Sequence, residues 1–454
     1  MTVRSLAESG VAGVRRVLAP LVGPGGDTAV VGRNSGWMLG DRGIRLSIGL
    51  VVNAWLVRYL GAEQLGLLSF AQSIIVITAV ASQLGLETIL VRDLVRQPET
   101  DLEILGTALR MRLAGWLATL GLATATAAWL RPGDPKAMWL TWACSLTALA
   151  QTLDIVETWF QSRTRVAPVA IARLSAFLVG AVAKVIAILA RAPLETIALI
   201  LSGEALLSSA GLVVAYVRAG GMPRRWRPVR ARAVGLMHDA WPLMLNSVAI
   251  VISVRVDQMI LTTLKGTAEN GIYAAAQRLT EILFYIPVAV TAAANPILLR
   301  SHQRDPAEYV RRLQRVFSAL AGAGLLIAVV VSLGAPLIVR ILFGPAFQAS
   351  ARVLAIQAWS CPPLFLGIAQ TNWFIAENRQ RGLLVRSALA AAVSVVLNFV
   401  LVPRMGARGA ALTMLLSQTG AQILFNALDP ATRPLFRMQC RALVPFASWR
   451  SANS

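Results

Sequence analysis

Arg255 and Asp257 lie inside an otherwise apolar run, residues 247–264, that is long enough to cross a bilayer as a helix. Charged side chains within a membrane usually face a helix-bundle interior or a water-filled cavity, and they often bind an ion or a charged substrate. Residues two apart on a helix are about 200° apart around its axis, so these two side chains cannot pair with each other. We therefore expect each to meet its own partner on another helix or at a cavity wall.

Other apolar runs also carry charges. Arg278 and Glu281 are three residues apart, a spacing that lets them pair on one helix face. Asp41 and Arg45, four apart, can pair in the same way. At about 1.5 Å per residue, several of these charges fall in one half of the membrane, which predicts a cationic zone tempered by carboxylates. The alternative is a set of fixed salt bridges that only hold helices together. The remaining charges considered are Arg42, Arg58 and Lys184.

The composition requires a membrane protein. Of 454 residues, 56% are hydrophobic and only 14% charged, and the mean hydropathy is +0.63. A soluble chain of this length would need far more polar surface. The net charge of +21 could suggest nucleic-acid binding, but no basic domain with interleaved aromatic residues supports that function.

Apolar runs of about 20 residues, the length that crosses a bilayer as a helix, occur twelve times. The sequence therefore predicts an all-α polytopic protein with about twelve transmembrane helices. The expected spans are residues 36–60, 66–91, 107–130, 137–160, 168–190, 195–217, 238–264, 271–299, 316–343, 350–376, 382–403 and 407–428.

The arginines and lysines orient these spans. In alternate loops and the two tails there are 29 of them, against 8 in the intervening loops. Because cytoplasmic loops carry the excess of Lys and Arg, both termini are expected in the cytoplasm, and an even number of spans gives the same result. The cytoplasmic charges would contact anionic membrane lipids.

Two six-helix halves are indicated by a basic loop and an internal echo. The loop, residues 218–234, follows the sixth span, and GLLSFAQ at residues 66–72 is echoed by GIYAAAQ at 271–277, 205 residues later. An offset of six spans preserves orientation, so the sequence predicts a parallel repeat. We expect a cytoplasmic tail at 1–33, six-helix bundles at 34–217 and 236–430, a basic cytoplasmic linker at 218–235 and a cytoplasmic tail at 431–454.

The loops are too short to hold the catalytic groups of a typical membrane enzyme. No GxxxxGK[ST] loop for ATP, no GxSxG elbow and no cluster of metal ligands is present. Transport, without enzymatic activity, metal or cofactor, is therefore the expected function.

Several motifs support a family resemblance. Residues 34–74, NSGWMLGDRGIRLSIGLVVNAWLVRYLGAEQLGLLSFAQSI, resemble the start of bacterial oligosaccharide flippases, which are polysaccharide biosynthesis proteins of the multidrug/oligosaccharidyl-lipid/polysaccharide exporter superfamily. VRVDQMIL at 254–261, GIYAAAQRLTEIL at 271–283 and GARGAALTMLLSQ at 406–418 resemble later parts of these proteins. The resemblance covers nearly the whole chain from residue 34.

The resemblance implies two six-helix bundles around a central cavity that opens alternately to the two sides of the bacterial cytoplasmic (inner) membrane. The cargo would be an undecaprenyl-diphosphate-linked oligosaccharide, moved to the outer leaflet for surface polysaccharide such as O-antigen or exopolysaccharide. A polysaccharide polymerase and other assembly proteins could be partners, and a proton or sodium ion could be exchanged. A diphosphate in a low-dielectric cavity needs cations, and arginine suits it best. The residues expected to bind cargo are Arg45, Arg42, Arg58, Lys184, Arg255 and Arg278, and those expected to couple an ion are Asp41, Asp257 and Glu281.

Three other functions remain open, one of which is a non-transporting membrane scaffold that binds lipid-linked precursors. A cation-coupled multidrug exporter of the same superfamily would favour an acidic, aromatic cavity, which the excess of intramembrane arginine disfavours. A polysaccharide polymerase is disfavoured by the short loops and missing catalytic clusters.

Overall fold

The structure is a computed structural model that describes residues 28–377 and 380–443. Within these residues it contains helices and short turns and no strand, so the expected all-α polytopic fold is confirmed. Long apolar runs form helices in a bilayer because only a helix satisfies every backbone polar group within one segment.

The helices of the first half are joined by short turns. They are α2 (Thr28–Thr78), α3 (Val80–Gln83), α4 (Glu87–Arg96), α5 (Asp101–Leu130), α6 (Pro135–Thr152), α7 (Ile155–Ser162), α8 (Ala167–Leu189) and α9 (Leu194–Arg218).

The second half repeats this pattern and adds a short helix at its end. Its helices are α10 (Arg230–Lys265), α11 (Thr267–Leu283), α12 (Tyr285–Arg304), α13 (Pro306–Phe343), α14 (Ser350–Ala358), α15 (Cys361–Ala376), α16 (Gln380–Met405), α17 (Ala407–Thr419), α18 (Phe425–Leu428) and α19 (Arg433–Leu443).

Each expected span coincides with one helix or with consecutive helices separated by a short break. Seven described helices are each long and apolar enough to cross a membrane, and α14 with α15, bent by 42°, can form an eighth span. The other expected spans are interrupted: α6 and α7 meet at a turn, α11 and α12 at another, and a short π-helix, Gly420–Leu424, follows α17. The first expected span and the start of the second are merged in α2, where Gly61 has a φ of 67°, and the second span continues through α3 into α4.

The internal repeat is visible in the backbone. Gly61 and Gly266 are 205 residues apart and both adopt positive φ with extended ψ, 67° and 177° against 91° and 173°. Only glycine adopts this conformation readily, because a Cβ atom would clash with the backbone. The turn between the first two spans of each half is therefore the same turn, as the expected parallel repeat requires.

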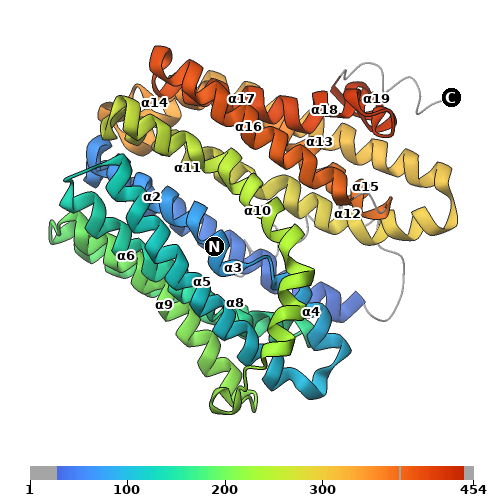
Figure 1. Cartoon of the computed structure of the whole chain (residues 1–454). Coiled ribbons are helices and arrows are strands. Elements are labelled where there is room, and N and C mark those ends of the chain that lie inside the picture. The colour runs from blue at the N-terminus through green and yellow to red at the C-terminus, as the bar shows by residue number, and fades with distance from the viewer. Residues whose placement is uncertain (1–27, 378–379, 444–454) are drawn as a thin grey trace, which may run out of the picture.

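The two halves meet along α2 and α11 (Figure 1). The largest buried apolar cluster crosses this contact and includes Leu65, Phe70 and Tyr273. We call this end of the molecule, where Gly66 lies against Thr267 and Gly271 against Ala62, the sealed end. Toward the opposite end, at α4 on one side and α12 and α15 on the other, the two groups of helices diverge (Figure 1).

The loop between the halves is fastened to the first half. The Trp226 indole donates to the Tyr216 hydroxyl at 3.1 Å, and the amides of Arg227 and Val229 donate to Leu102 and Thr107 of α5 at 3.2 and 2.9 Å. The basic linker is therefore a packed segment rather than a free tether.

The last helix, α19, lies within the expected C-terminal tail. Its apolar side chains Leu435, Met438 and Ala442 are buried against the second half, and Gln439 is fully buried. The helix therefore docks onto the bundle.

Candidate functional site

A cavity of about 500 Å³ lies between the halves. It is bounded mainly by α2 from the first half and by α10 and α11 from the second, and this volume is typical of small-molecule sites. Three of the expected cargo-binding residues line it: Arg45, Arg255 and Arg278. Glu281, expected to couple an ion, lines it too.

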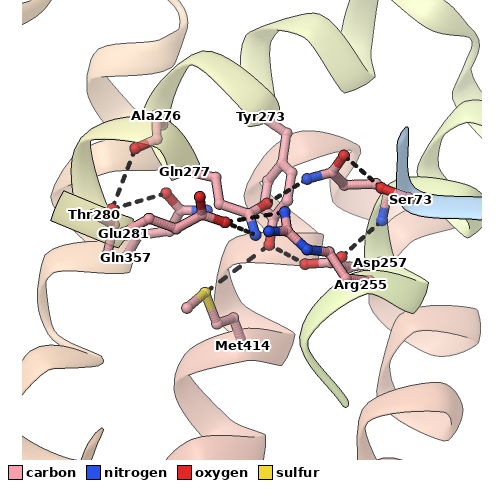
Figure 2. A network of polar contacts seen from close by, with 11 residues as sticks. Ser73, Arg255, Asp257, Tyr273, Ala276, Gln277, Thr280, Glu281, Gln357 and Met414 are labelled. Atoms are coloured by element: carbon pink, nitrogen blue, oxygen red, sulfur yellow. Dashed lines mark hydrogen bonds and ion pairs between the residues drawn. The ribbon is translucent and has the colours of Figure 1, made fainter. Parts of the chain in front are cut away.

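Arg255 is held by Glu281. Its guanidinium lies 3.0 Å from a Glu281 carboxylate oxygen, and the two side chains are 28% and 36% exposed. The sequence spacing allowed Glu281 to pair with Arg278 instead. The structure shows the pair between helices, because Arg255 on α10 reaches Glu281 across the α10–α11 interface (Figure 2).

Arg278 lines the cavity, and no carboxylate of a described residue is in contact with it. It is half-buried, and no hydrogen bond or ion pair joins it to any residue that the structure describes. Glu281 attracts it from one turn away on the same helix, but the Glu281 carboxylate contacts Arg255 instead. A half-buried guanidinium in a membrane cavity needs an anionic or water partner, because its five donors cannot be left unsatisfied without a free-energy cost. Arg45 faces the same cavity from α2.

A chain of amides links the two halves beside these charges. The Ser73 hydroxyl of α2 donates to Gln258 at 2.8 Å, and Gln258 donates to Gln277 at 2.7 Å. Gln277 in turn donates to Glu281 at 3.2 Å (Figure 2). These uncharged residues give no charge signal in the sequence, although Gln277 closes the repeated GIYAAAQ motif.

Asp257 points away from the cavity, as its spacing from Arg255 predicts. It is 4% exposed and accepts hydrogen bonds from the Tyr273 hydroxyl and from the Gln258 backbone amide, the latter at 2.8 Å (Figure 2). The expectation that the two charges occupy different faces is confirmed. Asp257 lies in the core of the α10–α11 interface, so an ion would reach it only if that interface opens.

Arg58 and Lys184 do not line the cavity. Arg58 donates to the backbone carbonyls of Ile341 and Leu342, the latter at 2.8 Å, and so binds the end of α13. These carbonyls have no partner within their own helix because they belong to its last turn. Arg58 was expected to bind cargo, but the structure turns its side chain toward α13 rather than toward the cavity.

Lys184 is 5% exposed and forms an ion pair with Glu204 of α9 at 2.8 Å. It joins two helices of the first half, which is the structural alternative considered for such charges. The side chains of Asp41 and Arg42 lie outside the part of the chain that the structure describes.

The first-half side of the cavity is polar but mostly uncharged. Asn53, Ser69, Gln72, Thr147 and Ser202 line it opposite the second-half arginines. Amide and hydroxyl groups can donate and accept hydrogen bonds with neutral polar ligands. The cavity can therefore hold a ligand with an anionic part near α11 and an uncharged polar part near α2, α6 and α9.

Family relationships follow from sequence comparison. Residues 31–302, more than half of the chain, match the sequence model of the family described as polysaccharide biosynthesis protein. The chain belongs to this family. Residues 242–401 also match the MatE family, and no curated protein matches the sequence.

Solved structures share the fold of this chain. The lipid II flippase MurJ in an inward closed conformation aligns with a TM-score of 0.69 and 12% identity over 92% of each chain. An inward-facing multidrug resistance MATE transporter of the MOP superfamily gives 0.65 and 13%, over 87% of this chain and 94% of its own. A point mutant of the Vibrio cholerae MATE transporter VcmN gives 0.55 and 16%, over 90% and 96%. The chain is thus a multi-pass membrane protein with the twelve-helix transporter and flippase fold of this superfamily.

Proposed function

We propose that this family member is a flippase that moves an undecaprenyl-diphosphate-linked oligosaccharide from the inner to the outer leaflet of the bacterial cytoplasmic membrane. The observation that supports this most is Arg278, a cation in a cavity between the halves that no carboxylate contacts among the described residues. A diphosphate would supply that contact. Arginine holds phosphate oxygens with two parallel hydrogen bonds, and the low dielectric strengthens the attraction.

The position of the cavity suits alternating access. Its walls come from both halves, so rocking of one half against the other would expose it to either side of the membrane in turn. The uncharged side chains opposite the arginines, among them Asn53 and Gln72, would form hydrogen bonds with the sugar hydroxyls. The polyprenyl chain would remain in lipid.

The orientation follows from the basic loops. Cytoplasmic termini place the linker and the exposed arginines of α19 in the cytoplasm and the sealed end outside. A proton or sodium ion could be exchanged at Glu281 or Asp257, and a polysaccharide polymerase would act on the delivered cargo.

A multidrug exporter is the second candidate, and Glu281 together with the MatE match favours it. An organic cation would be attracted to a free carboxylate. Glu281 is already paired with Arg255, however, and Arg45 and Arg278 add further positive charge to the same cavity. We therefore place the flippase first.

The decisive experiment compares Arg278→Gln with Arg340→Gln. Arg340 is an exposed residue of α13 that does not line the cavity, so it controls for loss of one charge. In cells lacking the chromosomal copy, Arg278→Gln should abolish surface polysaccharide at a normal membrane level of the protein, whereas Arg340→Gln should restore it. Full complementation by Arg278→Gln would reject the cargo assignment. If the protein instead makes the cells resistant to cationic drugs while surface polysaccharide is unchanged, the multidrug exporter is favoured.

A further inference from the structure

We propose that Glu281 is a built-in counter-anion that holds Arg255 while the cavity is empty and yields it to the diphosphate of the cargo. This inference rests on the proposed function and assigns to Glu281 the role of limiting how tightly the cargo is held. It distinguishes the Arg255–Glu281 pair from a salt bridge that only joins two helices.

The Arg255–Glu281 pair is accessible from the cavity. Glu281 and Arg255 are 36% and 28% exposed, and both line the cavity. The Lys184–Glu204 pair, by contrast, includes a lysine side chain that is 6% exposed, and neither residue lines the cavity. Breaking a buried pair leaves an uncompensated charge, whereas breaking a hydrated one exchanges it for water or a ligand. The Arg255–Glu281 pair is therefore the one that a ligand can open.

The charges around Glu281 favour transfer of Arg255 to the cargo. In the empty cavity Glu281 offsets Arg255, and Arg278 lies three residues from Glu281 on the same helix. A diphosphate carries more than one negative charge, so it can engage Arg278 and also compete with Glu281 for Arg255. Once Arg255 is transferred, the Glu281 carboxylate lies beside the bound phosphates and repels them. This repulsion lowers the affinity and favours release, which a transporter needs as much as binding.

Hydrogen bonds hold the Glu281 carboxylate in place. Gln277 donates to the same carboxylate oxygen that pairs with Arg255, so Glu281 keeps a partner when Arg255 leaves. Gln277 is itself held by Gln258, and Gln258 by Ser73 of the first half. The counter-anion is therefore positioned by groups from both halves. A movement that separates Ser73 from Gln258 would loosen this support.

The test measures binding of undecaprenyl diphosphate to the purified full chain in nanodiscs of neutral lipid. We expect Glu281→Gln to bind about tenfold tighter than the parent protein, because one like charge near the phosphates is removed. Its transport in proteoliposomes should be slower, since release becomes limiting. Glu63→Gln is the matched control, because Glu63 is exposed and does not line the cavity.

The outcomes separate this inference from the proposed function. If the parent protein does not bind undecaprenyl diphosphate, or if Arg278→Gln binds it equally well, the proposed function fails. If the parent binds and Arg278→Gln does not, but Glu281→Gln binds no tighter, the counter-anion role is overturned. Glu281→Ala serves as a second variant should Glu281→Gln not fold. It too should bind more tightly, whereas a structural role would make both substitutions weaken binding.

Discussion

Gly66 of α2 and Gly271 of α11 each lie against the backbone of the other's helix. A Cβ atom on Gly66 would overlap the carbonyl oxygen of Thr267, and one on Gly271 would overlap that of Ala62. Both pairs of equivalent residues, 66 with 271 and 62 with 267, are 205 apart. The contact therefore repeats itself when the halves are exchanged, so the axis that relates them passes between these two helices. Any motion that opens the sealed end must break both contacts together.

Enlarging either glycine should open the sealed end. Gly66→Ala or Gly271→Ala places a methyl group where backbone oxygen lies, and such overpacking costs about 1–3 kcal/mol. We expect the closed arrangement to lose population, so that an Asn53→Cys reporter in the cavity reacts faster with an impermeant thiol reagent added from the sealed-end side. Native cysteines would be replaced beforehand.

Gly121→Ala is the control for these substitutions, because a Cβ there meets nothing within 4 Å. It should leave labelling unchanged. Equal labelling in all three variants would show that the glycine contact does not hold this end closed.

Arg58 should act on conformation rather than on cargo. Arg58→Ala removes hydrogen bonds to the last carbonyls of α13, which for an exposed arginine we expect to cost about 1–2 kcal/mol. Labelling of the cavity reporter from the sealed-end side should rise, while the Kd for undecaprenyl diphosphate stays within about twofold. Arg340→Ala, on an exposed arginine of α13, should change neither. Lost binding with unchanged labelling would instead make Arg58 a cargo ligand.

The Lys184–Glu204 pair should behave as a structural unit. Lys184→Met alone leaves the Glu204 charge without its partner inside the first half, and breaking such a pair typically costs about 3–5 kcal/mol. The purified variant should therefore inactivate faster on heating. Combining Lys184→Met with Glu204→Gln should recover most of the loss, as a double-mutant cycle would measure. No recovery would mean that the two side chains stabilise the protein independently.

Docking of α19 should depend on Gln439. This fully buried amide donates to Gln370 at 3.2 Å and accepts from Asn426 at 2.8 Å. Gln439→Ala removes these two bonds and a third to the Gln422 carbonyl at 3.0 Å, and these bonds tie α19 to the second half. The helix should therefore detach more often, and trypsin should cleave faster after exposed Arg437 and Arg441. Cleavage in Gln314→Ala tests the neighbouring contact, because Gln314 donates to the Met438 carbonyl at 3.1 Å. Unchanged cleavage in Gln439→Ala would place the stability of α19 in its apolar face alone.

Much of the architecture could be predicted because membrane helices are constrained by length and hydropathy. The repeat at an offset of 205 residues was visible in GLLSFAQ and GIYAAAQ. In the structure, Gly61 and Gly266 adopt positive φ at the same offset. The opposite directions of Arg255 and Asp257 also followed from helix geometry alone. Both inferences needed only the spacing of residues along the sequence.

The partners of the charges could not be predicted, because they depend on how helices are rotated and spaced. Glu281 had a permitted partner on its own helix, yet it pairs with Arg255 on α10. Arg58 and Lys184 were expected to face the cavity, but one faces α13 and the other α9. The amide chain from Ser73 was missed for the same reason, since glutamine and serine within apolar runs give no charge signal. Helix α19 could have been found from arginines at every fourth position, 433, 437 and 441.

The fastened loop after α9 has a consequence for exchanging parts between relatives. Leu236 and Ala240 of α10 belong to the apolar cluster of the first half, and Asp239 pairs with Arg92 at 2.7 Å. Just beyond Pro242, Leu243 and Met244 still lie against Gly85 of the first half, and farther along the helix the Ser253 carbonyl accepts a hydrogen bond from Ser394 of α16 at 3.3 Å. In a chimaera joined within the loop, the first turns of α10 would come from the relative, whereas the first half against which they pack would come from this protein. One joined after Met244 would instead keep these contacts of the first half and put the junction near the place where α10 passes from one half to the other.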